Sequence, residues 1–341
     1  AYAALSSVHS AMWFVRYDRT EQRVSLAKTT VEKALQLQPD LPQAHQALGI
    51  FYYWCYLDYD RALHEFEVAQ RTLPNDYLIS RGIGLILRRQ GKMEQSLANL
   101  TKAFALNPLS SQGALQAGVT CAWMRNLEGA YRYYDIAIRL SPDRPDPYAS
   151  KTQAVLRLAG DIAQARAAIE SARRIRLEND PSIAYSRVLL DLYDGTIHEA
   201  IKRLASEAWE VFEGLASYRP KVLLQAQLYG QMKQPQLEKS FYESAAKMTM
   251  AKIQQQPEEA LYHSSLGIAY AGLGRKQDAI REGKAGVDLL PVSKDALGGF
   301  YRVEELALIY AMVGEYDEAI RLLEYLRSIP GDFEQPTRLC S

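Results

Sequence analysis

The stretch ALYHSSLGIAYAGLGRKQDAIREGKAGVDLLP, from Ala260 to Pro291, shows the architecture of this chain most directly. It contains the pair Leu266-Gly267, a tyrosine three residues after that glycine, a further glycine at 274, a small residue at 279 and a closing proline. The closing proline recurs at nearly constant spacing: Pro39, Pro74, Pro108 and Pro142 are 35, 34 and 34 residues apart, and Pro257 and Pro291 are 34 apart. A period of 34 indicates one structural unit copied end to end.

Each recurring position has a role in a pair of helices. A small residue on the first helix, such as Gly84, Gly118 or Gly267, lets the second helix approach closely. A glycine then supplies the left-handed backbone that ends the first helix, and a small residue five positions later seats the second helix. These glycines are Gly91, Gly160, Gly195, Gly274 and Gly314, and the small residues are Ser96, Ala165, Ala200, Ala279 and Ala319. We therefore expect helices without any β-sheet. We also expect Gly84, Gly118 and Gly267 to lie where two helices cross.

This pattern of Leu-Gly-x-x-Tyr, Gly, Ala and Pro resembles the tetratricopeptide repeat (TPR). The resemblance implies an all-α fold, a right-handed superhelical solenoid of about nine antiparallel helix pairs in a single array over residues 1–330. The expected repeats lie near residues 1–39, 43–74, 77–108, 111–142, 146–177, 181–212, 217–257, 260–291 and 300–330, followed by an irregular tail at 331–341. The repeats at 146–177 and 181–212 lack the proline, and 217–257 departs from the pattern through a longer second helix.

Two stretches, Tyr56–Ala69 and Glu305–Ala319, are similar to the repeat arrays of large bacterial signalling proteins. In those proteins a kinase, a nucleotide cyclase or a winged-helix DNA-binding domain precedes the repeats. The resemblance implies an effector domain before Ala1, whose activity would lie outside residues 1–341.

The composition limits the possible partners. Lys plus Arg and Asp plus Glu both number 40, so no global field attracts nucleic acid or an anionic membrane. No apolar run approaches the roughly 20 residues of a membrane span. The cysteines, Cys55, Cys121 and Cys340, are odd in number and far apart, so neither a disulfide framework nor a zinc site is expected. We expect a cytoplasmic protein, with the periplasm as the alternative.

Function in such an array is expected on the first helices, which line the concave side. Their groove-facing positions are basic and aromatic, which suits an extended acidic segment of a partner protein. The candidate peptide-binding residues are Tyr53, Trp54, Arg81, Arg88, Arg89, Gln116, Trp123, Lys151 and Arg157. The alternative interpretation is that the arginines are solvated and the tryptophans pack between helices.

The sequence offers little basis for catalysis. The five histidines are scattered, and His45 and His263 occupy a packing position of the repeat. We therefore expect no catalytic, cofactor or metal site, and a non-catalytic scaffold that binds a protein or peptide. The set of Lys, Asn and Arg that grips chaperone tails in this family is missing. Two other interpretations are a structural module that self-associates through its open ends, including the C-terminal helix, and an RNA-binding helical repeat, which the neutral charge disfavours.

Overall fold

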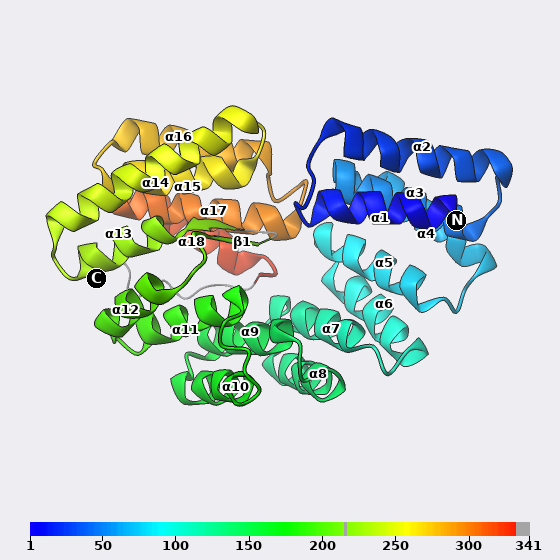
Figure 1. The fold of residues 1–341 in the computed structure, drawn as a ribbon, viewed down its shortest axis with the longest axis horizontal. Coiled ribbons are helices and arrows are strands. Elements are labelled where there is room, and N and C mark those ends of the chain that lie inside the picture. The colour runs from blue at the N-terminus through cyan, green and yellow to red at the C-terminus, as the bar shows by residue number, and fades with distance from the viewer. Residues whose placement is uncertain (215–216, 332–341) are drawn as a thin grey trace. The chain divides into compact units, whose positions relative to one another are not determined.

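The computed structural model describes residues 1–214 and 217–331, and in them the chain is almost entirely α-helical, as predicted (Figure 1). The first nine helices are α1 (Tyr2–Phe14), α2 (Glu21–Leu37), α3 (Pro42–Phe51), α4 (Tyr59–Thr72), α5 (Tyr77–Arg89), α6 (Met93–Leu106), α7 (Ser111–Trp123), α8 (Leu127–Leu140) and α9 (Pro145–Ala154). The others are α10 (Ile162–Arg174), α11 (Pro181–Tyr193), α12 (Ile197–Ser206), α13 (Lys221–Gln231), α14 (Pro235–Gln255), α15 (Ala260–Gly272), α16 (Lys276–Leu289), α17 (Ala296–Met312) and α18 (Tyr316–Ser328). The described residues thus contain 18 α-helices, the number that nine pairs require. Two π-helical turns, η1 (Tyr52–Tyr56) and η2 (Val155–Ala159), extend α3 and α9.

The chain divides into two compact units, and the boundary falls within α7. Unit 1 runs from Ala1 to Thr120, and unit 2 begins at Cys121. Within unit 1, α1 packs against α2 and α3, and α5 packs against α4 and α6. Within unit 2, each first helix from α9 onward packs against its own second helix and, in most cases, against the following pair. Helices therefore pack mainly within their own pair and next against the neighbouring pairs, which is the arrangement that a repeat array uses.

The turns inside the pairs confirm the role assigned to glycine. Gly91, Gly160, Gly195, Gly274 and Gly314 all have positive φ, between 64° and 81°. Where the corresponding turn has no glycine, a larger residue takes the same conformation: Arg16 with φ 62°, Leu57 with φ 52°, Arg125 with φ 57° and Lys233 with φ 55°. This conformation costs about 1–2 kcal/mol for a residue with a side chain, so at these four turns the geometry of the pair prevails over local preference.

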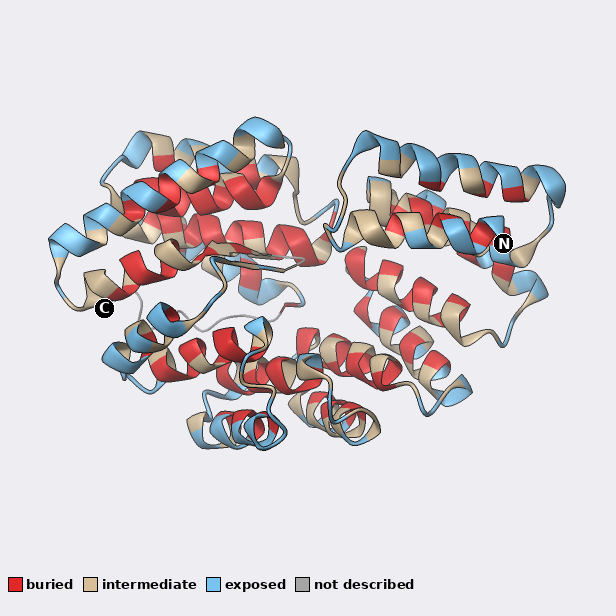
Figure 2. Ribbon diagram, viewed as in Figure 1, coloured by how far each residue is buried: buried red, intermediate tan, exposed pale blue. Residues whose placement is uncertain are grey.

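Small residues lie where helices cross, as expected. A Cβ added to Gly84 would lie 2.7 Å from Cγ of Leu100 on α6. At Gly267 the Cβ would lie 3.0 Å from the carbonyl oxygen of Ala279 on α16. The five small residues of the second helices, Ser96, Ala165, Ala200, Ala279 and Ala319, are all buried. Figure 2 shows the resulting pattern, in which buried residues follow the first helices and exposed ones the outer sides of the second helices.

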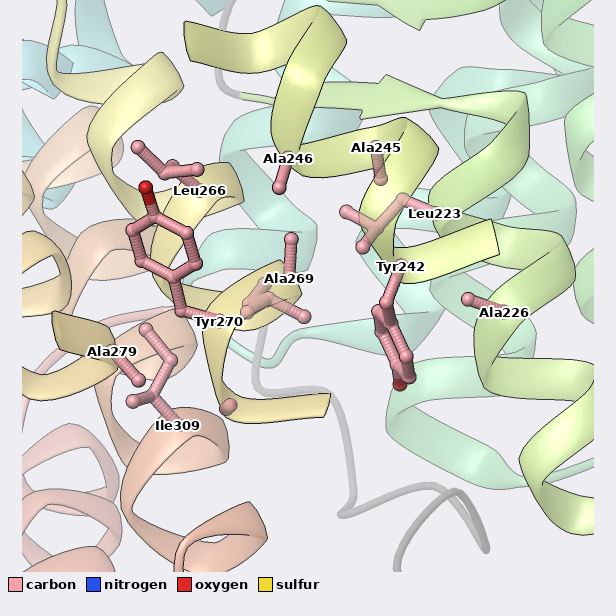
Figure 3. Close-up of a cluster of buried hydrophobic side chains, with 12 residues drawn as sticks. Leu223, Ala226, Tyr242, Ala245, Ala246, Leu266, Ala269, Tyr270, Ala279 and Ile309 are labelled. Carbon is pink, nitrogen blue, oxygen red and sulfur yellow. The ribbon is translucent and has the colours of Figure 1, made fainter. Parts of the chain in front are cut away.

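The largest described core cluster lies in unit 2, where α13 to α17 meet (Figure 3). Leu223 and Ala226 from α13, Tyr242 from α14, Tyr270 from α15 and Ile309 from α17 are all buried there. Alanines alternate with these larger side chains, so the helices approach closely and the larger residues fill the spaces between them. One helix of this cluster, α14, has 21 residues and is longer than the repeat pattern allows, as the sequence indicated.

The expectation that no sheet occurs is wrong at one place. The helix α12 ends at Ser206, and β1 (Val211–Glu213) pairs antiparallel with β2 (Tyr218–Pro220). The predicted repeat had run to Phe212. Instead, the Phe212 ring stacks on Tyr185 of α11, with ring centroids 4.2 Å apart and planes 8° apart. This aromatic contact and the pairing with β2 stabilise residues 211–213 as an extended strand.

Two further findings concern the whole described chain. Of the predicted tail at 331–341, only Gly331 is among the described residues. Residues 332–341, which include Cys340, lie outside them. Within residues 1–214 and 217–331, none of the helices combines the length and the apolar character that crossing a membrane demands.

Candidate functional site

In unit 1, two of the predicted groove arginines are buried between first helices. Arg88 on α5 is 6 % exposed and donates to Gln116 of α7 through two atoms: Nη2 lies 2.6 Å from the side-chain Oε1, and Nη1 lies 3.3 Å from the carbonyl oxygen. Nη1 also lies 3.2 Å from Oγ1 of Thr120. The structure thus brings Arg88 and Gln116 together, and the guanidinium holds α5 against α7.

Arg89 has a similar position toward the preceding pair. Its Nε lies 3.4 Å from the hydroxyl of Tyr53, which is on η1, and both side chains are buried. The Tyr53 ring also meets Tyr59 edge-on, with centroids 5.8 Å apart. Tyr53 and Arg89 therefore fix the π-helical turn against α5.

Trp54, Arg81 and Gln116 are the predicted groove residues of unit 1 that stay partly exposed, and Gln116 is the one of them that pairs with Arg88. The Trp54 indole stacks on Phe14 of α1, with ring centroids 5.1 Å apart. Burial lowers the pKa of the Arg81 guanidinium, because desolvation disfavours its charged form. Across the described part of the chain no carboxylate forms an ion pair with Arg81. A weakly hydrated, unneutralised cation of this kind can receive a carboxylate at low desolvation cost.

In unit 2, the remaining predicted residues contact other parts of the chain. Trp123 is 4 % exposed and meets the rings of Phe300 and Tyr301 on α17 edge-on, with centroids 5.3 and 5.7 Å away. Arg157 lies on η2, donates to the Tyr301 hydroxyl at 3.2 Å and lies over the same ring. Lys151 pairs with Asp135 at 2.6 Å. The structure therefore brings Trp123 and Arg157 together, around a tyrosine of the last helical pair.

Three contributors to this cluster were missed by the sequence analysis: Phe300, Tyr301 and Arg125. Arg125 donates three hydrogen bonds to the end of α18, to the carbonyl oxygens of Leu326 (3.3 Å), Arg327 (3.1 Å) and Ile329 (3.1 Å). One available signal was the presence of Arg125 at a turn where other repeats have glycine. Another was the residues Ala296–Gly299, which lengthen α17 before the expected repeat.

The β1–β2 hairpin adds a second group of unexpected contacts in unit 2. Tyr218 is buried against Tyr262 of α15, and burial raises the pKa of Tyr218 to about 12. Arg219 forms an ion pair with Glu305 of α17 at 3.3 Å, and Glu305 also pairs with Arg302 at 2.9 Å. Arg302 is fully buried, and desolvation lowers its pKa. These charges are compensated inside the fold, so they serve its packing.

The histidines at the packing position form the same constellation in both repeats. Nδ1 of His45 lies 2.7 Å from Glu65 Oε2 and its Nε2 lies 2.9 Å from the carbonyl oxygen of Pro39. For His263 the corresponding distances are 2.8 Å to Glu282 and 2.8 Å to the carbonyl oxygen of Pro257. Each ring thus joins the preceding turn to the second helix of its own pair.

Other kinds of site find little support in the described residues. Among residues 1–214 and 217–331, no three His, Cys, Asp or Glu side chains are grouped as metal ligands. A pocket of about 440 Å³ opens between α14 and the end of α15 with its following turn, and Met250, Lys247, Tyr270 and Arg275 are in its lining. None of the predicted groove residues lines it.

Comparison with known proteins supports the fold assignment. No family model and no curated protein matches the chain. Among solved structures, PilW, described as a widely conserved type IV pilus biogenesis factor, is 18 % identical, with a TM-score of 0.50 over 60 % of this chain and 90 % of PilW. PilF of Pseudomonas aeruginosa is 16 % identical (TM-score 0.44; 76 % and 95 % covered), and a TPR protein of Thermus thermophilus is 24 % identical (TM-score 0.40; 48 % and 88 % covered). The likeness to PilW shows the fold alone, an array of paired helices, and the helix pairs with their left-handed turns in the described residues are of the TPR type.

Proposed function

We propose that this chain is a non-catalytic scaffold that binds an extended acidic segment of a partner protein on the first helices of unit 1. The observation that carries the proposal is Arg81, a partly buried guanidinium with a lowered pKa and no carboxylate partner among the described residues. Keeping such a cation in the fold costs free energy, which a ligand carboxylate would offset. Trp54, partly exposed on η1 and stacked on Phe14, would provide an apolar contact to a further part of the same extended segment.

The other predicted residues have supporting roles in this proposal. Arg88, Arg89, Gln116 and Tyr53 hold α3, α5 and α7 in register by the hydrogen bonds described above. They fix the positions of Trp54 and Arg81, which reduces the ordering cost of binding. Trp123, Lys151 and Arg157 belong to unit 2 and are already engaged there.

The fold itself agrees with this proposal, since TPR-type arrays expose concave surfaces for extended segments. The resemblance to repeat arrays of bacterial signalling proteins extends the proposal to a larger signalling protein, in which this scaffold would recruit a partner. PilW is described as a type IV pilus biogenesis factor, and recruitment during assembly of a complex is the kind of role that such a scaffold could fill here.

The test compares Arg81→Gln with Arg71→Gln, which removes an exposed arginine from α4. The ligand is a labelled peptide of alternating Glu and Leu, and a Lys-Leu peptide serves as the negative probe. We expect Arg81→Gln to weaken binding of the acidic peptide by about tenfold, the value of one charge-assisted hydrogen bond, while the control does not. Equal affinities of both variants, with unchanged helicity, would exclude Arg81 as a ligand-binding residue.

A second candidate function is self-association through the ends of the array. On α18, Tyr316 is 64 % exposed and Ile320, one turn further, is 53 % exposed. These side chains lie on the face that a following repeat would cover, and covering them would stabilise a stacked pair. Light scattering of the Ile320→Asp variant tests this: a mass that depends on concentration in the native protein should become constant in the variant.

A further inference from the structure

The contact between the end of α7 and the last helical pair is unusual for a repeat array. Repeats normally contact their neighbours, yet Trp123 reaches residues roughly 180 positions further along the chain and Arg125 residues roughly 200 positions further. Both sides of this contact belong to unit 2. It consists of one apolar part, Trp123 with Phe300 and Tyr301, and one polar part, Arg125 with the carbonyl end of α18.

The polar part is a specific feature of residue 125. The last carbonyl groups of a helix lack partners within the helix and carry partial negative charge, so a guanidinium satisfies both needs. To place it there, Arg125 adopts φ 57°, the left-handed conformation that glycine fills in five other turns of this chain. Glycine would adopt that backbone without strain, so the turn geometry does not require the arginine. Its position is explained by the three hydrogen bonds to α18.

The apolar part has the composition of a recognition site. Trp123 offers an aromatic wall, and Arg157 offers a donor that reaches the Tyr301 hydroxyl at 3.2 Å while lying 5.6 Å from its ring centroid. The site thus receives one aromatic ring edge-on and a second ring whose hydroxyl is hydrogen-bonded. Aromatic residues combined with arginine are the side chains that most often dominate protein interfaces.

We propose that Trp123 and Arg157 form a docking site for an aromatic pair near the start of a helix, that the chain's own Phe300-Tyr301 occupies it, and that Arg125 holds this contact closed as a reversible clasp. While the clasp is closed, a partner segment with the same aromatic pair is excluded from Trp123 and Arg157. When it opens, the last pair leaves the site and the same chemistry becomes available to a second molecule. The proposal concerns unit 2 alone and does not depend on the peptide site proposed in unit 1.

The exposed position of Arg125 makes the polar part adjustable. Solvent weakens its hydrogen bonds, so their combined contribution is modest, in the range of one hydrogen bond between uncharged groups. Losing them should raise the population of the open form by about fivefold. A change of this size lies within the reach of a competing ligand or a salt change, whereas the buried core of α15 to α17 stays intact.

The experiment compares Arg125→Gly with Lys233→Gly by native-state hydrogen exchange. Both substitutions replace a left-handed residue in the turn inside a pair, but only Arg125 donates hydrogen bonds to the end of α18, whereas the exposed Lys233 makes none to α18 within the described residues. We expect amide exchange in segments 121–126 and 296–304 to accelerate about fivefold in Arg125→Gly and to stay unchanged in Lys233→Gly. Tyr301→Ala, which removes the ring contacts of Trp123 and Arg157, should accelerate the same two segments.

A second measurement distinguishes a docking site from ordinary packing. A labelled peptide with the sequence of residues 296–304, ALGGFYRVE, should bind the Arg125→Gly variant about fivefold more tightly than the native protein. The same peptide with Ala in place of Phe300 and Tyr301 should not bind. The proposal is overturned if Arg125→Gly and Lys233→Gly exchange alike, if faster exchange spreads evenly over α9 to α16, or if both peptides bind equally.

Discussion

Replacing Gly267 with alanine tests the packing on which the fold depends. The Cβ of an alanine at this position would lie 2.7 Å from Cδ1 of Ile309, 3.0 Å from the carbonyl oxygen of Ala279 and 3.0 Å from the backbone nitrogen of Gly283. Comfortable contacts between such atoms are about 3.5–4.0 Å. Ile309 can rotate away, but the two backbone atoms of α16 move only if the whole helix moves. Figure 3 shows Ile309 of α17 beside Ala279 of α16, in the core that this movement would disturb.

The expected magnitude is a balance of two effects. Alanine in place of glycine inside a helix gains up to about 1 kcal/mol through backbone entropy. Overpacking of a well-packed site costs typically about 1–3 kcal/mol, and the upper part of that range applies because the clash involves main-chain atoms. We therefore expect Gly267→Ala to lower the free energy of unfolding by about 1–2 kcal/mol.

The assay is urea unfolding followed by circular dichroism at the helix band. Gly113→Ala is the matched control, because this glycine is also helical but its added Cβ would lie no closer than 3.3 Å to any atom, and the nearest atoms belong to the Ser110 side chain. The control should be neutral or slightly stabilising. If Gly267→Ala were as stable as the native protein, the assigned crossing of α15 and α16 would be wrong.

The remaining predictions concern a helix cap, a histidine pair and the thiols. Asp295 accepts hydrogen bonds from the backbone N–H groups of Leu297 and Gly298 at 3.0 and 2.9 Å, so Asp295→Ala should lower the unfolding free energy by about 1–2 kcal/mol in urea titrations, and a loss below a few tenths would contradict its role as a cap. The hydrogen bond to Glu282 raises the pKa of His263 above its ordinary 6.5, and the same bond lowers the pKa of Glu282 below its ordinary 4.5. The stability from His263 is therefore present in full below pH 6.5 and disappears as the pH rises through the raised pKa, whereas that from Glu282 is present above pH 4.5 and disappears as the pH falls through the lowered pKa. His263→Gln should accordingly destabilise the protein more at about pH 5.5 than at about pH 8.5, whereas the exposed His198→Gln should show no such difference; equal losses at both pH values would disprove the pairing. Burial raises the pKa of Cys55 to about 11 from an ordinary 9.0. Its alkylation by iodoacetamide near neutral pH should therefore be about a hundredfold slower in the native protein than in urea, and comparable rates would show that the thiol is accessible.

Several features of the fold were readable from the sequence because they depend on neighbouring residues. The glycines at 91, 160, 195, 274 and 314 adopt left-handed backbone, since each turn is closed by residues within one pair. The small residues five positions later are buried for the same reason, and His45 and His263 are tied within their own pairs. Local geometry repeats with the sequence, so the all-α fold follows from the period alone.

The candidate site followed from the sequence only in part. A groove position tells which face of a helix a residue occupies, but it does not tell what lies opposite. Arg88 and Arg89 were expected to face a ligand, and the structure shows them hydrogen-bonded to Gln116 and Tyr53. An arginine near several polar side chains of adjacent helices satisfies its donors internally, because leaving them unpaired in a buried position is costly.

The order of residues is enough to specify the repeating unit: two helices, a left-handed turn and a small residue at each crossing. Two features emerge only once the pairs are assembled, the contact of Trp123 and Arg125 with the last pair and the position of the β1–β2 hairpin against α11 and α15. These contacts join residues of unit 2 that are far apart in the chain. Their existence depends on small rotations added over many pairs, whereas the sequence period reports only the step from one pair to the next.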